Sequence, residues 1–212
     1  MMKPATDQVI FLMGPTASGK TDLAISLSKL LPVELISVDS ALVYRGMDIG
    51  TAKPTVSEQA LVRHHLIDLV DATQAFTVAQ FQIAYQHAVD DITSRGGRAL
   101  LVGGTGLYVR AVVDGLTLPG QWPEVRARLD DELVTLGPEA LHQRLCQLDS
   151  TAGSKMEPSN SRRIIRALEV CEGSGRPFSS FGPGVDTYPA SEVQQVALRW
   201  PRDVLARRIE ER

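Results

Sequence analysis

The sequence predicts an α/β fold, in which a parallel sheet flanked by helices is interrupted by a helical insertion domain. In the first part of the chain, short continuous apolar runs alternate with helical patterns, which is typical of parallel strands joined by crossover helices. From about residue 119 onward, helical patterns follow one another with no strand between them. We therefore predict a core of residues 1–118 plus 190–212 and an insertion of residues 119–189, with Pro and Gly at both borders.

The first elements form a βαβ unit. The apolar run Val9–Met13 is typical of a strand that is buried on both faces of a sheet. The glycine-rich loop Gly14–Thr21 follows, and then a helical pattern that Pro32 ends. Val33–Val38 is a second strand candidate. Strand, loop, helix and strand within about 30 residues match the βαβ motif.

The next segment adds two strand candidates and two helices. His65–Val70 is the weaker strand candidate. Thr77 is expected to cap a helix that runs to Ser94. Ala99–Val102 is a short buried-strand run, and a helix to about Val113 follows it after two glycines.

The insertion is predicted to be helical. Residues 123–148 and 159–172 carry helical patterns. Ser159 or Asn160 can cap the second of these helices, and Gly173 is expected to end it.

The end of the chain is predicted to return to the sheet. Gly, Pro and Ser crowd residues 173–184, so this stretch is expected to be a loop. Val193–Trp200 has the alternation and β-branching of a strand. Pro201 then opens a final helix, Arg202–Arg212.

Composition excludes several classes of protein. The 212 residues are 43% hydrophobic and 22% charged, which excludes wholesale disorder. With 22 basic and 25 acidic residues the net charge is −3, too acidic for a protein that grips long duplex nucleic acid, while a local patch for a small RNA stays open. Cys146 and Cys171 alone indicate neither a disulfide framework nor a metal site.

The N-terminal segment indicates no targeting sequence. The apolar stretch that begins at Val9 stops at Gly14, which is too short for a signal peptide or a membrane span. We therefore expect a cytoplasmic chain with no membrane partner, and we expect it to be a monomer.

The strongest motif is the loop Gly14–Thr21, which fits the pattern GxxxxGK[ST] in full between a predicted strand and a predicted helix. Its glycines let backbone N–H groups converge on an anion, and the helix N-terminus adds partial positive charge. Lys20 offers a point charge to the terminal phosphates, and Thr21 offers a hydroxyl to Mg²⁺. The motif indicates a P-loop NTPase-like core that binds a diphosphate or polyphosphate, without specifying ATP.

Asp39 follows the second predicted strand, at the sheet edge where open α/β sheets place their ligands. Its carboxylate could hold Mg²⁺ or accept a proton from an attacking nucleophile. The alternative is a carboxylate that caps its own loop through backbone hydrogen bonds. Ser40, next to it, is equally compatible with a turn hydroxyl.

The strand candidate Ala99–Val102 ends in Gly103–Gly106 instead of the acidic residue expected of an ordinary NTPase. This ending fits a backbone that approaches a ligand closely, and a tight strand-to-helix turn is the alternative.

The polar, glycine-rich loop 46–54 is typical of loops that carry function. Lys53 could meet a phosphate there or stay solvated. His64 and His65 have no second cluster at metal-ligand spacing, so we expect them on the surface of a helix or strand.

Arginines gather in two of the predicted helices. Arg162 and Arg166 share a face near a helix start, where they oppose the helix dipole unless an anion lies there. The alternative is a solvated face paired with Glu169. Arg208 and Arg212, one turn apart in the last helix, could reach the phosphate site.

These segments together resemble the tRNA dimethylallyltransferases, also called tRNA isopentenyltransferases. The resemblance runs through nearly the whole chain, and its most specific block is Val38–Pro54. The other segments are Gly14–Thr21, His65–Asp68, Leu101–Tyr108 and Arg162–Val170. Members of the family continue with further helices past the position of Arg212, so the resemblance implies a chain truncated at its C-terminus.

The resemblance implies transfer of a dimethylallyl group from dimethylallyl diphosphate to N6 of the adenosine just 3′ of the anticodon in tRNA. The implied partners are the tRNA anticodon stem-loop and dimethylallyl diphosphate. The implied general base is Asp39, and the implied cofactor is Mg²⁺ with Thr21 as its protein ligand. The residues implied at the donor diphosphate are Gly14, Pro15, Thr16, Ala17, Ser18, Gly19, Lys20, Thr21, Arg208 and Arg212. The residues implied at the tRNA are Asp39, Ser40, Ala41, Leu42, Thr105, Arg126, Arg162, Arg163, Ile164, Ile165 and Arg166.

Two other functions compete with this one. A small P-loop kinase would share the P-loop and use Asp39 to activate a substrate hydroxyl, with ATP as donor. A non-catalytic, nucleotide-dependent RNA-binding module would bind tRNA without turnover. The absence of an obvious arginine-rich lid loop and the glycine-ended strand both speak against the kinase.

Overall fold

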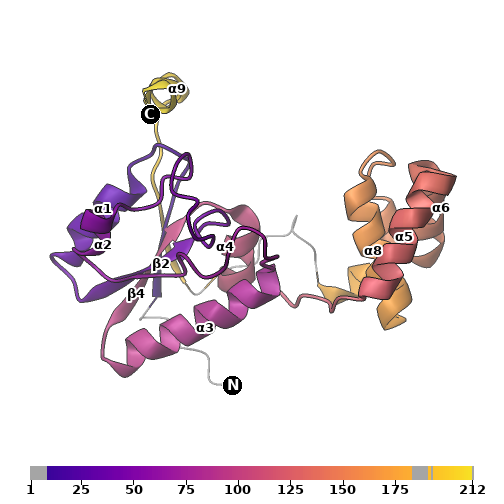
Figure 1. Cartoon of the computed structure of the whole chain (residues 1–212), viewed down its shortest axis with the longest axis horizontal. Coiled ribbons are helices and arrows are strands. Elements are labelled where there is room, and N and C mark those ends of the chain that lie inside the picture. The colour runs from indigo at the N-terminus through magenta and orange to yellow at the C-terminus, as the bar shows by residue number, and fades with distance from the viewer. Residues whose placement is uncertain (1–8, 183–190, 192, 212) are drawn as a thin grey trace. The chain divides into compact units, whose positions relative to one another are not determined.

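The computed structural model describes residues 9–182, 191 and 193–211 of the chain (Figure 1). The chain forms two compact units. Unit 1 comprises Met1–Gly115 with Pro189–Arg212, and unit 2 comprises Leu116–Tyr188. The first predicted border lay at residues 118 and 119, and the second, at 189 and 190, lies outside the described residues.

Unit 1 is built on a parallel sheet of five strands, in the order β3-β2-β4-β1-β5. Every neighbouring pair of strands runs parallel. The strands are β1 (Val9–Met13), β2 (Val33–Val38), β3 (His64–His65), β4 (Arg98–Gly103) and β5 (Gln194–Ala197). This order confirms the predicted P-loop NTPase-like sheet.

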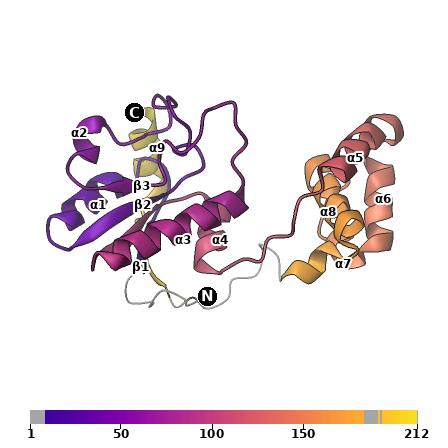
Figure 2. The same cartoon turned by 60° about the horizontal axis from the view of Figure 1, so that its bottom comes forward.

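Helices cover both faces of this sheet (Figure 2). Helix α1 (Lys20–Ser28) packs on one face, and α3 (Val78–Ser94) with α4 (Gly106–Val113) packs on the other. Because successive strand residues point to opposite faces, Leu35 joins the apolar cluster under α1 while Ile36 joins the cluster under α3. The unbroken apolar runs of the sequence are therefore explained by burial on both sides.

Local sequence signals set the ends of several helices. Thr77 caps α3 as predicted, and its side chain accepts a hydrogen bond from the backbone N–H of Gln80 in a capping box. A second capping box starts α2 (Val56–Gln59), a short helix that the sequence did not indicate. The last helix, α9 (Arg202–Glu210), ends before Arg212.

The predicted strand 65–70 is wrong over most of its length, because β3 contains only His64 and His65. Leu66 and Asp68 adopt the left-handed backbone region, with φ of 63° and 54°, and this conformation cannot continue a strand. Only an isolated bridge between Tyr44 and Val70 follows.

Unit 2 is helical, as predicted, but it contains more breaks than the sequence indicated. Its elements are α5 (Pro123–Leu136), α6 (Pro138–Leu148), α7 (Ser150–Gly153), α8 (Ser161–Ser174) and the 3₁₀ helix η2 (Phe178–Phe181). Gly137, with φ of 81°, separates α5 from α6, so the single helix predicted for 123–148 is wrong at this glycine. The 3₁₀ helix occupies part of the predicted loop 173–184.

Helix α8 begins as predicted and ends later than predicted. The Asn160 side chain caps its start by accepting a hydrogen bond from the Arg163 N–H. Gly173 does not end the helix, because Gly175 supplies the left-handed C-cap with φ of 69°. Gly173 instead makes room for an indole: a Cβ there would lie 2.2 Å from the Trp122 ring. Across the described ranges, no helix is long and apolar enough to cross a membrane.

Candidate functional site

A cavity of about 740 Å³ lies at the carboxyl edge of the sheet in unit 1. The P-loop that follows β1 forms one wall, and the ends of β2 and β4 form another. The loop 51–54 and helix α9 add residues from two further parts of unit 1. The cavity thus brings together Asp39, Leu42, Thr105 and Arg208 with all eight residues of Gly14–Thr21.

The P-loop folds into the conformation that an anion requires. Ala17 and Gly19 adopt the left-handed region, with φ of 58° and 87°. Backbone N–H groups in such alternating conformations converge to form an anion-binding concavity. Lys20 donates from Nζ to the carbonyls of Gly14 and Pro15, at 2.8 and 2.7 Å, so its ammonium lies across the loop. Thr21, in the first turn of α1, also lines the cavity.

Asp39 has one carboxylate oxygen fixed by its own loop. Its Oδ1 accepts a hydrogen bond from the Ala41 N–H at 2.8 Å, which is the capping role that the sequence left open. The structure gives Oδ2 no hydrogen bond within the described part of the chain, and the residue lines the cavity. The neighbouring Ser40 N–H donates to Thr105 Oγ1 at 3.1 Å. The loop cap and a role in chemistry are therefore compatible in the same side chain.

The glycines that end β4 serve close packing of the backbone. A Cβ on Gly103 would lie 2.2 Å from the carbonyl oxygen of Val38, and one on Gly104 would lie 2.9 Å from that of Gly14. The close neighbours of these glycines are the backbones of β2 and the P-loop, which favours the tight-turn alternative. Both glycines also line the cavity, so a close approach to a ligand stays a prediction.

Lys53 is committed to an internal ion-pair cluster. Its Nζ lies 2.7 Å from Asp48, 2.6 Å from Asp68 and 2.8 Å from the Tyr44 carbonyl, and its side chain is only 4% exposed. Desolvation opposes the charged form, but the hydrogen bonds to Asp48 and Asp68 outweigh it and raise the pKa of Lys53. Lys53 therefore holds the loop 46–54 in place. The expectation of a solvated lysine is wrong.

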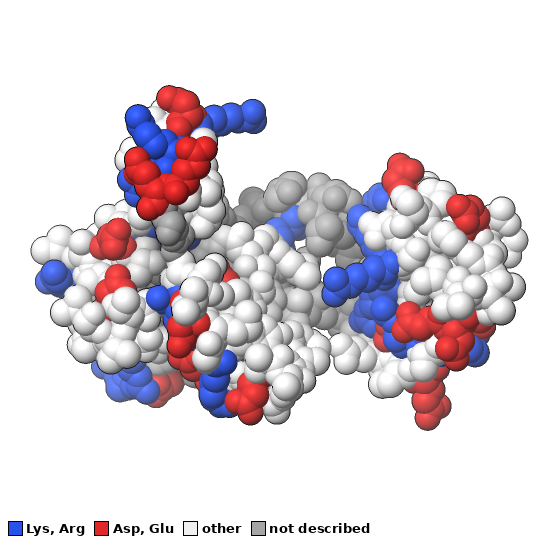
Figure 3. Space-filling view, turned by 45° about the horizontal axis from the view of Figure 1, so that its top comes forward, with Lys and Arg blue, Asp and Glu red and all other residues white. Residues whose placement is uncertain are grey.

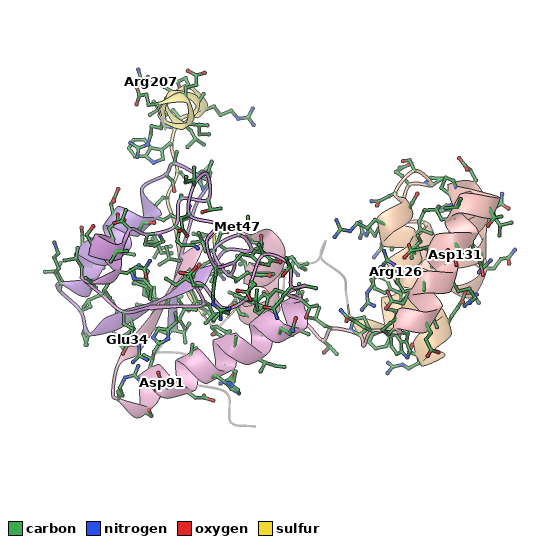
Figure 4. All side chains as sticks on the ribbon, in the orientation of Figure 1. Glu34, Met47, Asp91, Arg126, Asp131 and Arg207 are labelled. Atoms are coloured by element: carbon green, nitrogen blue, oxygen red, sulfur yellow. The ribbon has the colours of Figure 1, made fainter. Side chains whose placement is uncertain are left out.

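The two histidines are less exposed than expected. His64 lines the cavity, and its pKa is lowered chiefly because burial disfavours the imidazolium. The His65 side chain is 11% exposed and lies 2.7 Å from Glu34 Oε2. Arg95 also pairs with Glu34, near Asp91 at the end of α3 (Figure 4). Despite desolvation, the hydrogen bonds from Arg95 and His65 hold the pKa of Glu34 below its usual value.

Two arginines of unit 2, Arg126 and Arg166, lie beside one buried carboxylate. Glu169 Oε1 lies 2.8 Å from Arg166 Nη1 and accepts a hydrogen bond from the Trp122 N–H at 2.9 Å. Arg126, labelled in Figure 4, reaches Glu169 Oε2 at 3.8 Å and Asp130 at 3.1 Å. Arg166 also donates from Nη2 to the carbonyls of Pro119 and Gly120. The pairing of Arg166 with Glu169 is thus present.

The remaining residues implied at the RNA differ in exposure. Arg162 is exposed and Arg163 is half-buried, at the start of α8. Ile164 and Ile165 are 0% and 2% exposed, and they pack in the core of unit 2. Their side chains are therefore core residues, which corrects the expectation that they contact RNA.

The end of the chain contributes a contact that the sequence did not reveal. The Trp200 indole N–H donates to the Ser18 carbonyl at 3.0 Å, and Arg208 Nε donates to the Ala17 carbonyl at 2.7 Å. Arg208 also lies 4.7 Å over the Trp200 ring. Arg208 was predicted at this site and Trp200 was not. Arg212, its predicted companion, lies outside the described residues.

The residues present fit a Mg²⁺ ion only together with a phosphate ligand. Within residues 9–182, 191 and 193–211, no cluster of three or more His, Cys, Asp or Glu could hold a metal ion. Mg²⁺ needs only one or two protein oxygens when phosphates and waters complete its shell. The Thr21 hydroxyl lines the cavity beside the P-loop and suits that arrangement.

Comparison with known proteins gives consistent relatives. The family model described as IPP transferase matches residues 42–212. The tRNA dimethylallyltransferase of Kineococcus radiotolerans is 50% identical over 210 residues, which cover 96% of this chain and 66% of that protein. The tRNA dimethylallyltransferase of Chromobacterium violaceum is 53% identical over 175 residues, 82% of this chain and 54% of its own length.

Solved structures show the same likeness. The full-length tRNA isopentenylpyrophosphate transferase of Bacillus halodurans superimposes with a TM-score of 0.59 at 40% identity, covering 96% of this chain and 64% of that one. A eukaryotic dimethylallyltransferase acting on tRNA has a TM-score of 0.77 at 23% identity, over 96% of this chain and 52% of its own, and supports the fold alone. The chain spans 66% of the length of the Kineococcus relative and 64% of the Bacillus structure.

Proposed function

This chain belongs to the IPP transferase family, and on that premise we propose that it transfers a dimethylallyl group from dimethylallyl diphosphate to N6 of the adenosine just 3′ of a tRNA anticodon. One observation carries the proposal: the phosphate-binding loop and Asp39 line the same cavity. A site for the leaving diphosphate and a proton acceptor therefore face the same cavity, as the transfer requires.

The P-loop stabilises the leaving group. As the bond between C1 of the prenyl group and the bridging oxygen breaks, its electron pair goes to the diphosphate. The convergent N–H groups of the loop and the Lys20 ammonium stabilise the charge that develops there. When bound, Mg²⁺ held through the Thr21 hydroxyl would neutralise part of the same charge. ATP hydrolysis has no part in this chemistry.

Asp39 takes the proton from the nucleophile. The N6 amine forms the new bond to C1 and loses one proton, so that the product is a neutral secondary amine. Because an adenine amine is a weak nucleophile, a base that takes this proton as the bond forms assists the attack. The hydrogen bond from the Ala41 N–H fixes the Asp39 carboxylate through Oδ1. Asp39 Oδ2 is then left to accept the proton. A positioned general base of this kind contributes about 10²–10⁴-fold to the rate.

The RNA must deliver an unstacked base to this cavity. Sequence-specific RNA recognition favours loops, whose bases can be turned out and bound individually. We assign phosphate contacts to Arg162 and Arg163, at the start of α8, and base contacts to Leu42 and Thr105 in the cavity. The overall charge of −3 means that RNA affinity depends on such local clusters of arginine.

A labelling experiment tests the proposal. The chain is incubated with dimethylallyl diphosphate labelled in the prenyl group, with ATP labelled in the γ-phosphate, and with an anticodon stem-loop. We expect prenyl label on the RNA, at an adenosine N6, and labelling slower by at least about 10²-fold with Asp39→Asn. Phosphate label on the RNA would instead support the kinase, and RNA binding without either label would support a non-catalytic module. Either result would overturn the proposal.

A further inference from the structure

The last segment of the chain donates two hydrogen bonds to the P-loop of unit 1. The carbonyls of Ala17 and Ser18 each accept one hydrogen bond, from Arg208 Nε at 2.7 Å and from Trp200 Nε1 at 3.0 Å. The two donors lie more than 180 residues away in the sequence. They reach the loop because β5 pairs in parallel with β1, with Ala197 opposite Met13, so both strands end at the same edge.

These two hydrogen bonds fix the direction of the neighbouring N–H groups. In a planar trans peptide, the C=O and the following N–H point to opposite sides. Holding the carbonyls of Ala17 and Ser18 toward the C-terminal segment therefore turns the N–H groups of Ser18 and Gly19 away from it. Convergent N–H groups of this kind are what a P-loop presents to phosphate oxygens.

Trp200 also orders the arginine. The Arg208 guanidinium lies 4.7 Å over the indole ring, and its Nη2 lies 3.7 Å from the position of a Cβ on Gly19. Stacking on an aromatic face restricts a guanidinium that otherwise has many rotamers. The indole N–H thus contacts the loop directly, and the indole ring restricts Arg208.

Little else in this segment is buried. Helix α9 has no buried residue among those described, and all four residues of β5 are exposed. Figure 1 shows α9 at the edge of unit 1, away from the faces of the sheet. Its surface mixes acidic and basic side chains (Figure 3), so no uniform field draws it to the loop. Besides the backbone hydrogen bond from Leu198 to the Met13 carbonyl, the contacts of Trp200 and Arg208 are the side-chain hydrogen bonds that this segment makes to the P-loop among the described residues.

We propose that Trp200 is a positioning residue for the diphosphate site: its indole N–H holds the Ser18 carbonyl and its ring holds Arg208, so that the P-loop is preorganised for a diphosphate. The inference rests on the proposed function for the identity of the donor, but the binding of inorganic pyrophosphate tests it alone. Preorganised N–H groups need no rearrangement when the anion binds, which favours affinity.

Two variants separate the two contacts. Trp200→Phe keeps an aromatic ring for Arg208 and loses the N–H, whereas Trp200→Leu loses both. The matched control is Ile209→Ala, which truncates another exposed apolar residue in the same segment without touching the P-loop contacts. Isothermal calorimetry with Mg²⁺ and inorganic pyrophosphate gives the dissociation constant, and its stoichiometry counts the folded molecules.

We expect Trp200→Phe to raise the dissociation constant for pyrophosphate about three- to tenfold, the effect of one lost hydrogen bond. Trp200→Leu should raise it further, to about ten- to fortyfold, because the cation–π contact is lost as well. Ile209→Ala should leave it within about twofold. The KM for dimethylallyl diphosphate should rise in the same order as the pyrophosphate constant.

Equal dissociation constants in the wild type, Trp200→Phe and Trp200→Leu would overturn the inference, whatever the melting temperatures do. So would an Ile209→Ala variant that loses as much affinity as Trp200→Leu. If the graded loss of pyrophosphate binding is found but no prenyl group reaches RNA, the inference stands and the proposed function fails. The two failures are therefore distinguishable.

Discussion

Replacing Glu169 tests how unit 2 holds its arginines. The side chain is 5% exposed and accepts the Trp122 N–H at 2.9 Å and Arg166 Nη1 at 2.8 Å. Arg126 lies further away, at 3.8 Å. Glu169→Ala removes the carboxylate and leaves two guanidinium groups and one backbone N–H without this partner. Glu169→Gln keeps the volume and an acceptor for the N–H, but removes the charge.

The structure sets the size of the effect. Removing one partner of a fully buried ion pair costs about 3–5 kcal/mol. Arg166 and Arg126 are 30% and 34% exposed, so water can partly solvate them once Glu169 is gone, and the loss should lie at or just below the lower end of that range. We expect Glu169→Ala to lower the free energy of unfolding by about 2–3 kcal/mol. Glu169→Gln should lower it by about 1 kcal/mol.

Urea unfolding followed by tryptophan fluorescence measures this loss. The chain has two tryptophans, so a Trp200→Phe background leaves Trp122 as the reporter of unit 2. The matched control is Glu172→Ala, one turn further along α8, whose side chain is 20% exposed and pairs with Arg128 and Arg144, which are 50% and 31% exposed. Because this carboxylate is more exposed than that of Glu169, which is 5% exposed, the control should lose less than Glu169→Ala. The slope of the unfolding free energy against urea should stay constant in all variants.

Two results would refute the reasoning. The first is a free energy of unfolding for Glu169→Ala that lies within about 0.5 kcal/mol of the parent's, which is the range of an ordinary surface substitution. Alternatively, Glu172→Ala could lose as much as Glu169→Ala. In either case the buried carboxylate does not organise the arginines.

Three further predictions concern the other parts of the chain. Asp39→Asn should keep donor affinity within a few-fold while the single-turnover transfer rate falls by at least about 10²-fold; rescue by high Mg²⁺ with weakened donor binding would instead assign Asp39 to the metal. Gly173→Ala should lower the stability of unit 2 by about 1–3 kcal/mol in urea, because a Cβ would meet the Trp122 ring at 2.2 Å; an unchanged midpoint would contradict this packing. The folded-state pKa of Glu34 is lowered from 4.5, so its stabilising contribution is present above about pH 4.5 and is lost as the pH falls through the folded-state pKa. Glu34→Gln should therefore be less stable at neutral pH and lose less on acidification, as a pH series of melting curves would reveal.

Signals that act within a few residues were sufficient to predict much of the fold. The Thr77 cap and the Asn160 cap each depend on a hydrogen bond between residues three positions apart, and the structure has both. The P-loop also lies between a strand and a helix, as predicted. The strand predicted at 65–70 failed because Leu66 and Asp68 take positive φ. Leucine rarely adopts that conformation, and aspartate adopts it only in a minority of cases, so neither residue predicted the end of the strand.

The site was predicted in outline and not in its contacts. Lys53 carries a charge that the sequence could assign equally to a phosphate or to water, and its partners Asp48 and Asp68 became visible only once the loop was folded. Trp200 has no motif around it, and it meets Ser18 across 182 positions of sequence. Long-range contacts of this kind follow from strand order, which a pattern of apolar residues does not specify.

Helix α8 shows why the sequence motif 162–166 did not distinguish core residues from exposed ones. Its residues 162–166 look like one continuous motif, but a helix of 3.6 residues per turn divides them between faces. Ile164 and Ile165 enter the core, Arg166 turns to Glu169, and Arg162 stays exposed. A change in the core of unit 2 therefore moves the same helix that presents the arginines. On the proposed function, RNA affinity in a chain of net charge −3 depends on few local cations, so the packing of α8 and the affinity for RNA should change together.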